Sequence, residues 1–156
     1  ATRIPPHLLI SVSGKLFSLG VKGPAVEDDL KMVLKFIRQK QTPTIFIKLS
    51  VPMLFTIQDL SNEIRKYTLA YPRVDVGIAT CLTPIKDFCS SVYNTEIRKV
   101  NFIYELLPKL YEQKAAGNAY HLFLEKHLQQ EKFCLPKYSM NDIYEGIRNA
   151  NSGVTA

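Results

Sequence analysis

The stretch PAVEDDLKMVLKFIRQKQTPTIFIKLSV (residues 24–51) decides the fold class of this chain. In its first part, apolar residues recur at helical spacing, which predicts a helix over residues 24–39 with Pro24 in its first turn. Its second part is rich in β-branched and aromatic residues and is closed by Pro52, which predicts a strand over residues 44–51. A helix followed directly by a strand indicates an α/β protein.

A β-hairpin is predicted before this stretch. Residues 8–12 and 15–19 are two short apolar runs, and only Ser13 and Gly14 separate them. A two-residue connection that contains glycine is typical of a tight hairpin, because glycine adopts positive φ without strain.

A second and a third αβ step are predicted after it. Thr56 is a suitable N-cap for a helix, and Asp59 three residues later completes an approximate capping box. Residues 74–79 have the composition of a strand, and Thr83 with Pro84 then begins another helix. This alternation predicts that the strands at 44–51 and 74–79 are parallel and joined by a right-handed crossover.

The second half of the chain is predicted to be helical. Helical segments are expected at about 95–114, 119–132 and 140–149, with Pro108 kinking the first or ending it near Leu107. The expected fold is therefore α/β: an N-terminal β-hairpin followed by αβαβ forms a small mixed sheet, and a C-terminal half of about three helices packs on it. We expect one domain over residues 1–156, with a sheet-forming half at about 7–82 and a helical half at about 83–150.

Composition limits the class of protein. The chain has 156 residues, of which 46% are hydrophobic and 22% charged, and no apolar stretch is long enough to span a bilayer. No secretory leader is expected at its start. Cys81, Cys89 and Cys134 lack metal-type spacing, which suits a reducing compartment. We expect an intracellular protein, cytoplasmic or nuclear, without a metal or another cofactor.

Positive charge is concentrated in one region of the chain. The net charge is +6, and residues 30–58 contain five basic residues and no acidic one: Lys31, Lys35, Arg38, Lys40 and Lys48. On a helix the first three lie along one side, where they are suited to bind successive phosphates of a nucleic acid. The alternative is a solvated face, with the acidic residues 27–29 in the first helical turn complementing the helix dipole. An anion site requires Lys48 to lie beside the helical stripe.

A small-molecule pocket is the second candidate site. In open α/β sheets ligands bind beyond the carboxyl ends of the strands, where this sequence places Ser50, Thr80, Cys81 and Thr83. Cys81 precedes a predicted helix, a position that can lower a thiol pKa. No catalytic residues are assigned, because no catalytic motif is present. His121 and His127, six residues apart on a predicted helix, point in different directions and do not form a metal pair.

Three functions are consistent with these patterns. Tyrosines concentrate in the second half, where charges of both signs cancel, and tyrosine is favoured at protein interfaces. The first expectation is a non-enzymatic binding or assembly protein that contacts a protein partner, or a second copy of itself, through its helical half. The alternatives are binding of the RNA or DNA phosphate backbone through the basic region, and an α/β enzyme with a pocket near Ser50 and Cys81.

Overall fold

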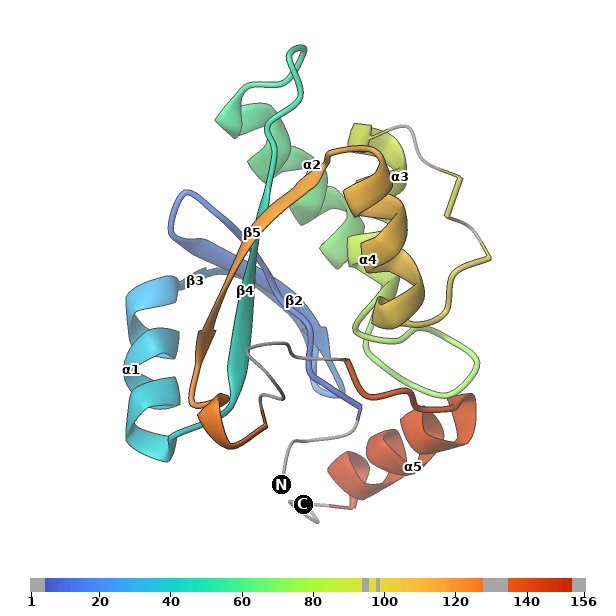
Figure 1. Cartoon of the computed structure of the whole chain (residues 1–156). Coiled ribbons are helices and arrows are strands. Elements are labelled where there is room, and N and C mark those ends of the chain that lie inside the picture. The colour runs from blue at the N-terminus through green and yellow to red at the C-terminus, as the bar shows by residue number, and fades with distance from the viewer. Residues whose placement is uncertain (1–4, 94–95, 98, 128–134, 153–156) are drawn as a thin grey trace.

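The computed structural model describes residues 5–93, 96–97, 99–127 and 135–152 (Figure 1). Within these residues the chain is a mixed α/β protein with α-helices and two small antiparallel sheets. Among the described helices, none has both the length and the apolar character that crossing a membrane requires. Because the two sheets are separate, the prediction of a single mixed sheet is wrong.

The first sheet is an antiparallel meander in the order β1, β2, β3. It comprises β1 (Ile10–Val12), β2 (Lys15–Gly20) and β3 (Gly23–Asp29). Ser13 and Gly14 connect the first two strands with φ values of 51° and 78°. Positive φ at both turn residues matches the twist of a two-residue hairpin, so the predicted hairpin is confirmed.

Strand β3 corrects the predicted start of the following helix. Residues 24–29 are extended and pair with β2, and the helix α1 begins only at Leu30 and ends at Lys40. Glu27 has a φ of 60° beside the register shift in this pairing, which marks a bulge in the strand. Asp29 is the N-cap of α1, and its carboxylate accepts a hydrogen bond of 2.9 Å from the Lys31 backbone N–H.

The second sheet pairs β4 (Thr44–Leu49) with β5 (Ala116–Leu122) in antiparallel register. Strand β4 confirms most of the predicted strand over residues 44–51. Strand β5 corrects the prediction of a helix over 119–132, since residues 119–122 are extended; residues 128–132 lie outside the described part. The partner of β4 is thus a distant antiparallel strand, and the predicted parallel crossover is wrong.

Residues 74–79 form a tight loop instead of a strand. Asp75 and Ala79 make an isolated antiparallel bridge, and Gly77 between them has a φ of 76°. The Asp75 carboxylate accepts a 2.8 Å hydrogen bond from the Val76 backbone N–H. These local bonds close the chain on itself, which prevents the segment from extending along a neighbouring strand.

The remaining helices are α2 (Ile57–Leu69), α3 (Thr83–Tyr93), α4 (Ile103–Glu112), the short 3₁₀ helix η1 (Glu125–His127) and α5 (Met140–Asn151). Helix α4 is shorter than the predicted segment at 95–114. It continues through Pro108, so of the two predicted outcomes, a kink or an end near Leu107, the end is wrong. Helices α2 and α5 both begin with capping boxes, from Thr56 to Asp59 and from Ser139 to Asp142.

Two hydrophobic clusters hold these elements together. The larger one joins the first hairpin to α2, α3 and α4, with Phe17, Ile64 and Leu106 fully buried. The smaller one joins the end of β2 to α5 through Leu19, Ile143 and Ile147. Figure 1 shows the ribbon of β4 and β5 crossing in front of the first sheet, with α1 standing at one side. No residue of α1 is buried, so this helix is the least integrated into the core.

Candidate functional site

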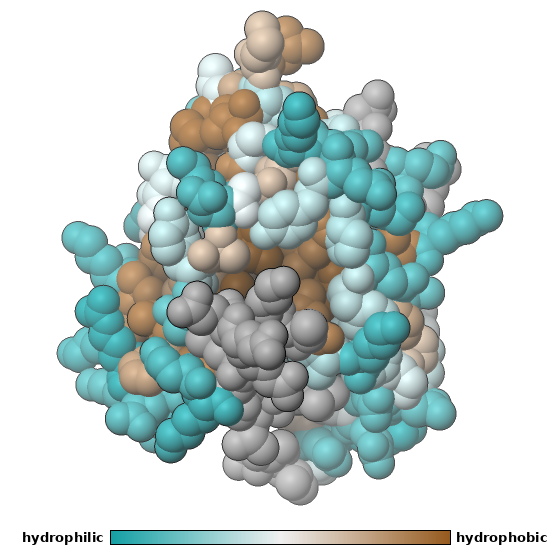
Figure 2. Space-filling view, viewed as in Figure 1, coloured by the Kyte–Doolittle hydropathy of each residue, from teal (hydrophilic) through white to brown (hydrophobic). Residues whose placement is uncertain are grey.

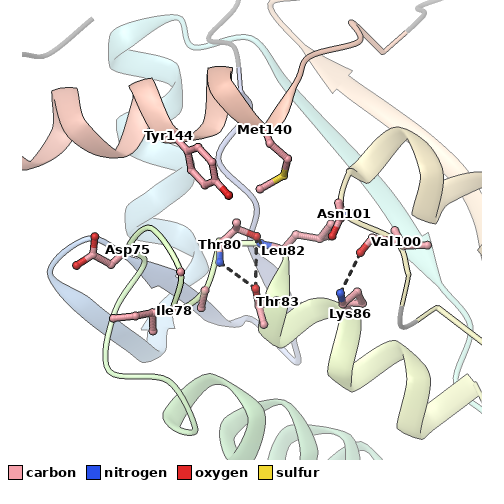
Figure 3. A pocket seen from close by; sticks show the side chains of 12 residues that line it. Asp75, Ile78, Thr80, Leu82, Thr83, Lys86, Val100, Asn101, Met140 and Tyr144 are labelled. Carbon is pink, nitrogen blue, oxygen red and sulfur yellow. Dashed lines mark hydrogen bonds between the residues drawn. The ribbon is translucent and has the colours of Figure 1, made fainter.

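The pocket region contains two of its four predicted residues. A depression of about 180 Å³ lies between the 75–83 segment, residues 100–101 and α5, and Thr80 and Thr83 line it (Figure 3). The Thr80 backbone N–H donates a 2.9 Å hydrogen bond to the Thr83 hydroxyl. Lys86 donates a 2.9 Å bond from Nζ to the Val100 carbonyl. These polar groups stabilise the turn before α3 and its contact with residue 100.

The other two predicted residues do not line this depression. Ser50 follows β4, and its backbone bonds to Ala115 and Tyr93, on the side of α3 and α4. Cys81 contacts the Pro6 carbonyl through its sulfur atom at 3.8 Å. The sequence placed all four side chains at one sheet edge, but β4 and the 74–79 loop do not share a sheet, so the structure separates Ser50 from the three residues at 80–83.

The basic region lies on exposed parts of the molecule. The side chains are exposed at all five predicted positions: Lys31, Lys35, Arg38, Lys40 and Lys48. Among the described residues, no carboxylate forms an ion pair with any of these five cations within 4.0 Å. The first three share one stripe of α1, while Lys48 is on β4. Their role in binding an anion stays a prediction.

The sequence suggested that the acidic residues 27–29 occupy the first turn of the helix, but they do not. They belong to β3, and the first turn of α1 contains no acidic residue. Glu27 forms an ion pair with Arg65 of α2. Among these acidic residues, Asp29 stabilises the helix N-terminus directly, because its carboxylate accepts a hydrogen bond from a backbone N–H of the first turn.

A loop rich in exposed apolar side chains follows β4. Among residues 51–57, here called the apolar loop, Met53 is fully exposed and Leu54 is 93% exposed, and Val51 and Ile57 are also exposed. Figure 1 shows this connection between β4 and α2 projecting from the body of the molecule, and Figure 2 shows brown and tan atoms at the same tip. Large apolar side chains that project together into solvent mark an interaction surface.

The apolar loop is held in a defined conformation. At its start the Ser50 N–H donates to the Ala115 carbonyl at 2.8 Å, and the Tyr93 hydroxyl donates to the Ser50 carbonyl at 2.7 Å. Within it the Phe55 N–H donates to the Pro52 carbonyl at 3.0 Å. The Phe55 side chain packs against the larger core cluster. The loop is therefore anchored while its two outermost side chains stay in solvent.

The capping box of α2 closes the loop at its far end. The Thr56 N–H donates to the Asp59 carboxylate at 2.8 Å, and the Asp59 N–H donates to the Thr56 hydroxyl at 3.0 Å. The hydrogen bond from the Thr56 backbone is the larger of the two effects that hold the pKa of Asp59 below its usual value. The carboxylate is thus ionised and bonded at neutral pH, which fixes the direction in which the loop enters α2.

A second exposed apolar surface lies on α1. Met32 is 64% exposed and Phe36 is 58% exposed, one helical turn apart. Together with Val33, Asp28 and Asp29 they line a depression of about 380 Å³, here called the α1 depression. In Figure 2 brown and tan atoms appear between teal side chains over the position of α1. The basic stripe lies about 100° further around the helix. The acidic rim of the depression comes from Asp28 and Asp29, which precede α1.

The described residues contain no metal centre. No three His, Cys, Asp or Glu side chains in this part of the chain are arranged to hold a metal ion. His121 lies on β5, so the predicted helical relation between His121 and His127 is wrong. Burial raises the pKa of the Cys89 thiol to about 12, which keeps it protonated at neutral pH. Cys89 is a core residue of α3 and is fully buried.

Comparison with known proteins adds no relative. No protein-family model, curated protein sequence or solved structure matches the chain. The fold and its surfaces define the class: a mixed α/β protein with two exposed apolar surfaces and a shallow pocket of mixed polar and apolar lining.

Sequence reasoning did not single out the apolar side chains of these two surfaces. In the sequence, Met53 and Leu54 belong to the connection after a strand, and Met32 and Phe36 belong to a predicted helix. One signal was present for the loop. Five consecutive apolar residues at 51–55 lie between the end of a strand and a helix N-cap, and an apolar run of this length in a connection is a signal of exposure.

Proposed function

We propose that this protein is a non-enzymatic binding protein that holds another polypeptide chain through its apolar loop. The observation that carries the proposal is the exposure of Met53 and Leu54 on a loop that hydrogen bonds at both ends hold in place. A preorganised loop loses little conformational entropy on binding, so more of the energy of apolar burial contributes to affinity.

The helical half contributes tyrosines to the same region. Tyr93 of α3 bonds to Ser50, and the exposed Tyr111 of α4 donates from its hydroxyl to the Gly117 carbonyl at 3.1 Å, near the start of β5. Tyrosines at the edge of an apolar surface are typical of protein interfaces. The proposed contact surface therefore includes both the tyrosines of the helical half and the apolar loop.

The expected location follows from the cysteines. Cys89 is a free thiol, buried in the core of α3. We infer a reducing, intracellular compartment, cytoplasmic or nuclear, in which such thiols persist.

Photo-crosslinking tests the proposed function. A benzophenone side chain at position 54 should form adducts with a polypeptide, either a partner or a second copy, in solutions of the chain with and without cell extract. The matched control carries the same group at Leu69, which is 53% exposed on α2 and outside the loop. A Met53→Asp substitution should remove the adducts at position 54. Equal adduct yields at positions 54 and 69 would contradict the proposal.

Nucleic-acid binding through the basic region is the second candidate. It is supported by the exposure of Lys31, Lys35 and Arg38 on one stripe of α1 with no carboxylate paired to them among the described residues. Charges of this kind bind the phosphate backbone in a salt-dependent manner, without base specificity.

A further inference from the structure

The chain carries two apolar surfaces that complement each other in shape. The apolar loop is convex and projects, whereas the α1 depression is concave and has Met32, Val33 and Phe36 in its wall. At the ~30 Å³ that a water molecule takes in the liquid, 380 Å³ offers space for about a dozen heavy atoms. That space exceeds what one methionine and one leucine side chain require.

The charges around the two surfaces are also complementary. Lys48 and Lys114 lie at the base of the apolar loop, because Leu49 pairs with Ala116 and the Ser50 N–H bonds to Ala115. Asp28 and Asp29 form the rim of the α1 depression. All four side chains are exposed, and no ion pair between them and another described residue is present. A loop seated in the depression would bring opposite charges together at its edge.

The two surfaces lie apart on the molecule. Figure 1 shows the loop between β4 and α2 at one extremity and α1 at the side of the body, near the opposite ends of β4 and β5. The loop of one chain therefore cannot enter its own depression, but it is free to enter that of another chain.

We propose that the apolar loop binds a second copy of this chain, with Met53 and Leu54 of one copy seated in the α1 depression of the next. This inference rests on the proposed function and names the partner. The contact joins two different surfaces, so it is heterologous and leads to head-to-tail chains or a closed ring. Its small area predicts reversible association, with a dissociation constant in the micromolar range or weaker.

Complementation between two variants tests this arrangement. The double substitution Met53→Asp with Leu54→Asp removes the loop surface, and Met32→Asp with Phe36→Asp removes the depression. Each variant alone should be monomeric, with self-association weakened about 100-fold or more. An equimolar mixture should form a dimer and nothing larger in sedimentation velocity, because one loop and one depression remain intact. The wild type should show a mass that rises with concentration above 17.7 kDa.

Controls keep the test decisive. Leu69→Asp with Val76→Asp changes two exposed apolar residues elsewhere and should associate like the wild type. If an aspartate variant loses its circular dichroism spectrum, glutamine at the same positions replaces it. A wild type that stays monomeric at millimolar concentration overturns the inference. So does a mixture that stays monomeric while the wild type associates, since that result indicates a symmetric contact.

Crosslinking separates failure of this inference from failure of the proposed function. With ¹⁴N and ¹⁵N copies mixed, benzophenone at position 54 should link to the peptide that contains Met32 and Phe36 in the other isotope. Links to a different polypeptide overturn self-docking and leave the proposed function standing. Absence of links to any polypeptide overturns both. Co-sedimentation with vesicles of phosphatidylcholine and phosphatidylserine (7:3) that depends on Met53 and Leu54, without links, assigns the loop to a membrane and also overturns both.

Discussion

The anchoring of the apolar loop by Tyr93 leads to a quantitative prediction for Tyr93→Phe. The substitution removes the 2.7 Å hydrogen bond from the tyrosine hydroxyl to the Ser50 carbonyl. It keeps the ring, which packs edge-on against Phe88 with centroids 6.5 Å apart. A neutral hydrogen bond contributes about 0.5–1.5 kcal/mol. Ser50 is exposed, so its carbonyl regains water when the bond is lost, and we expect a loss of about 0.5–1 kcal/mol.

Urea unfolding and amide exchange measure the two parts of this effect. The midpoint of unfolding should fall by the amount that corresponds to this loss, with an unchanged slope. The Phe55 N–H bonds to the Pro52 carbonyl inside the loop, so its exchange reports on the loop itself. Loosening of the anchor by about 0.5–1 kcal/mol should accelerate this exchange by about two- to fivefold.

The matched control is Tyr111→Phe. It removes a longer and exposed bond, 3.1 Å to the Gly117 carbonyl, from a residue that does not contact the loop backbone through its hydroxyl. We expect exchange at Phe55 to stay at the wild-type rate in this variant. The reasoning is refuted if Tyr93→Phe leaves the Phe55 exchange unchanged, or if both variants accelerate it equally.

Three further predictions concern the core, the pH dependence and the basic stripe. Leu106→Ala should lower the free energy of unfolding by about 2–5 kcal/mol, because Leu106 is fully buried, while Leu69→Ala on the surface should change it by less than about 0.5 kcal/mol in urea titrations. Burial raises the pKa of the Cys89 thiol from 9.0 to about 12, so the folded state favours the protonated thiol; this stabilisation is complete below pH 9 and is lost as the pH rises toward 12. The melting temperature should therefore fall between pH 8 and pH 11, and Cys89→Ala should fall less steeply; equal slopes would contradict the assignment. If the basic stripe binds nucleic acid, substituting glutamate for Lys31, Lys35 and Arg38 should abolish retention on a nucleic-acid column without changing the circular dichroism spectrum. Unchanged retention would exclude nucleic-acid binding through this stripe.

Local signals in the sequence identified the elements whose structure depends on local bonds. The first hairpin was predicted because Ser13 and Gly14 determine its turn, and both have the expected positive φ. The start of α2 was predicted for the same reason, since Thr56 and Asp59 bond to each other across three residues. Such bonds are encoded within a few residues, so they do not require knowledge of the rest of the fold.

The second sheet was missed because its pairing is not local. Thr44 lies opposite Leu122, and neither strand identifies the other in the sequence. Residues 116–122 contain no β-branched residue, and Leu124 and Leu128 just after them are four residues apart, a spacing that favours a helix. The segment 74–79 gave the opposite error: its valines suggested a strand, but the left-handed conformation of Gly77 closes a turn there. The candidate pocket required the strand at 44–51 and the segment 74–79 to share one sheet, so Ser50 lies apart from Thr80 and Thr83 in the structure.

The apolar loop shows why an exposed apolar surface is harder to predict than a core. In the sequence, residues 51–55 resemble buried residues, because hydrophobicity alone does not distinguish an element that packs from one that projects. Phe55 does pack against the core, whereas Met53 and Leu54, two positions and one position before it, remain in solvent. Two bonds to Ser50 and the cap at Thr56 hold the loop so that these two side chains cannot turn inward. A fold that only had to be stable would gain by burying them, at about 1.5–3 kcal/mol each, and their exposure is therefore the strongest argument that this loop binds a partner.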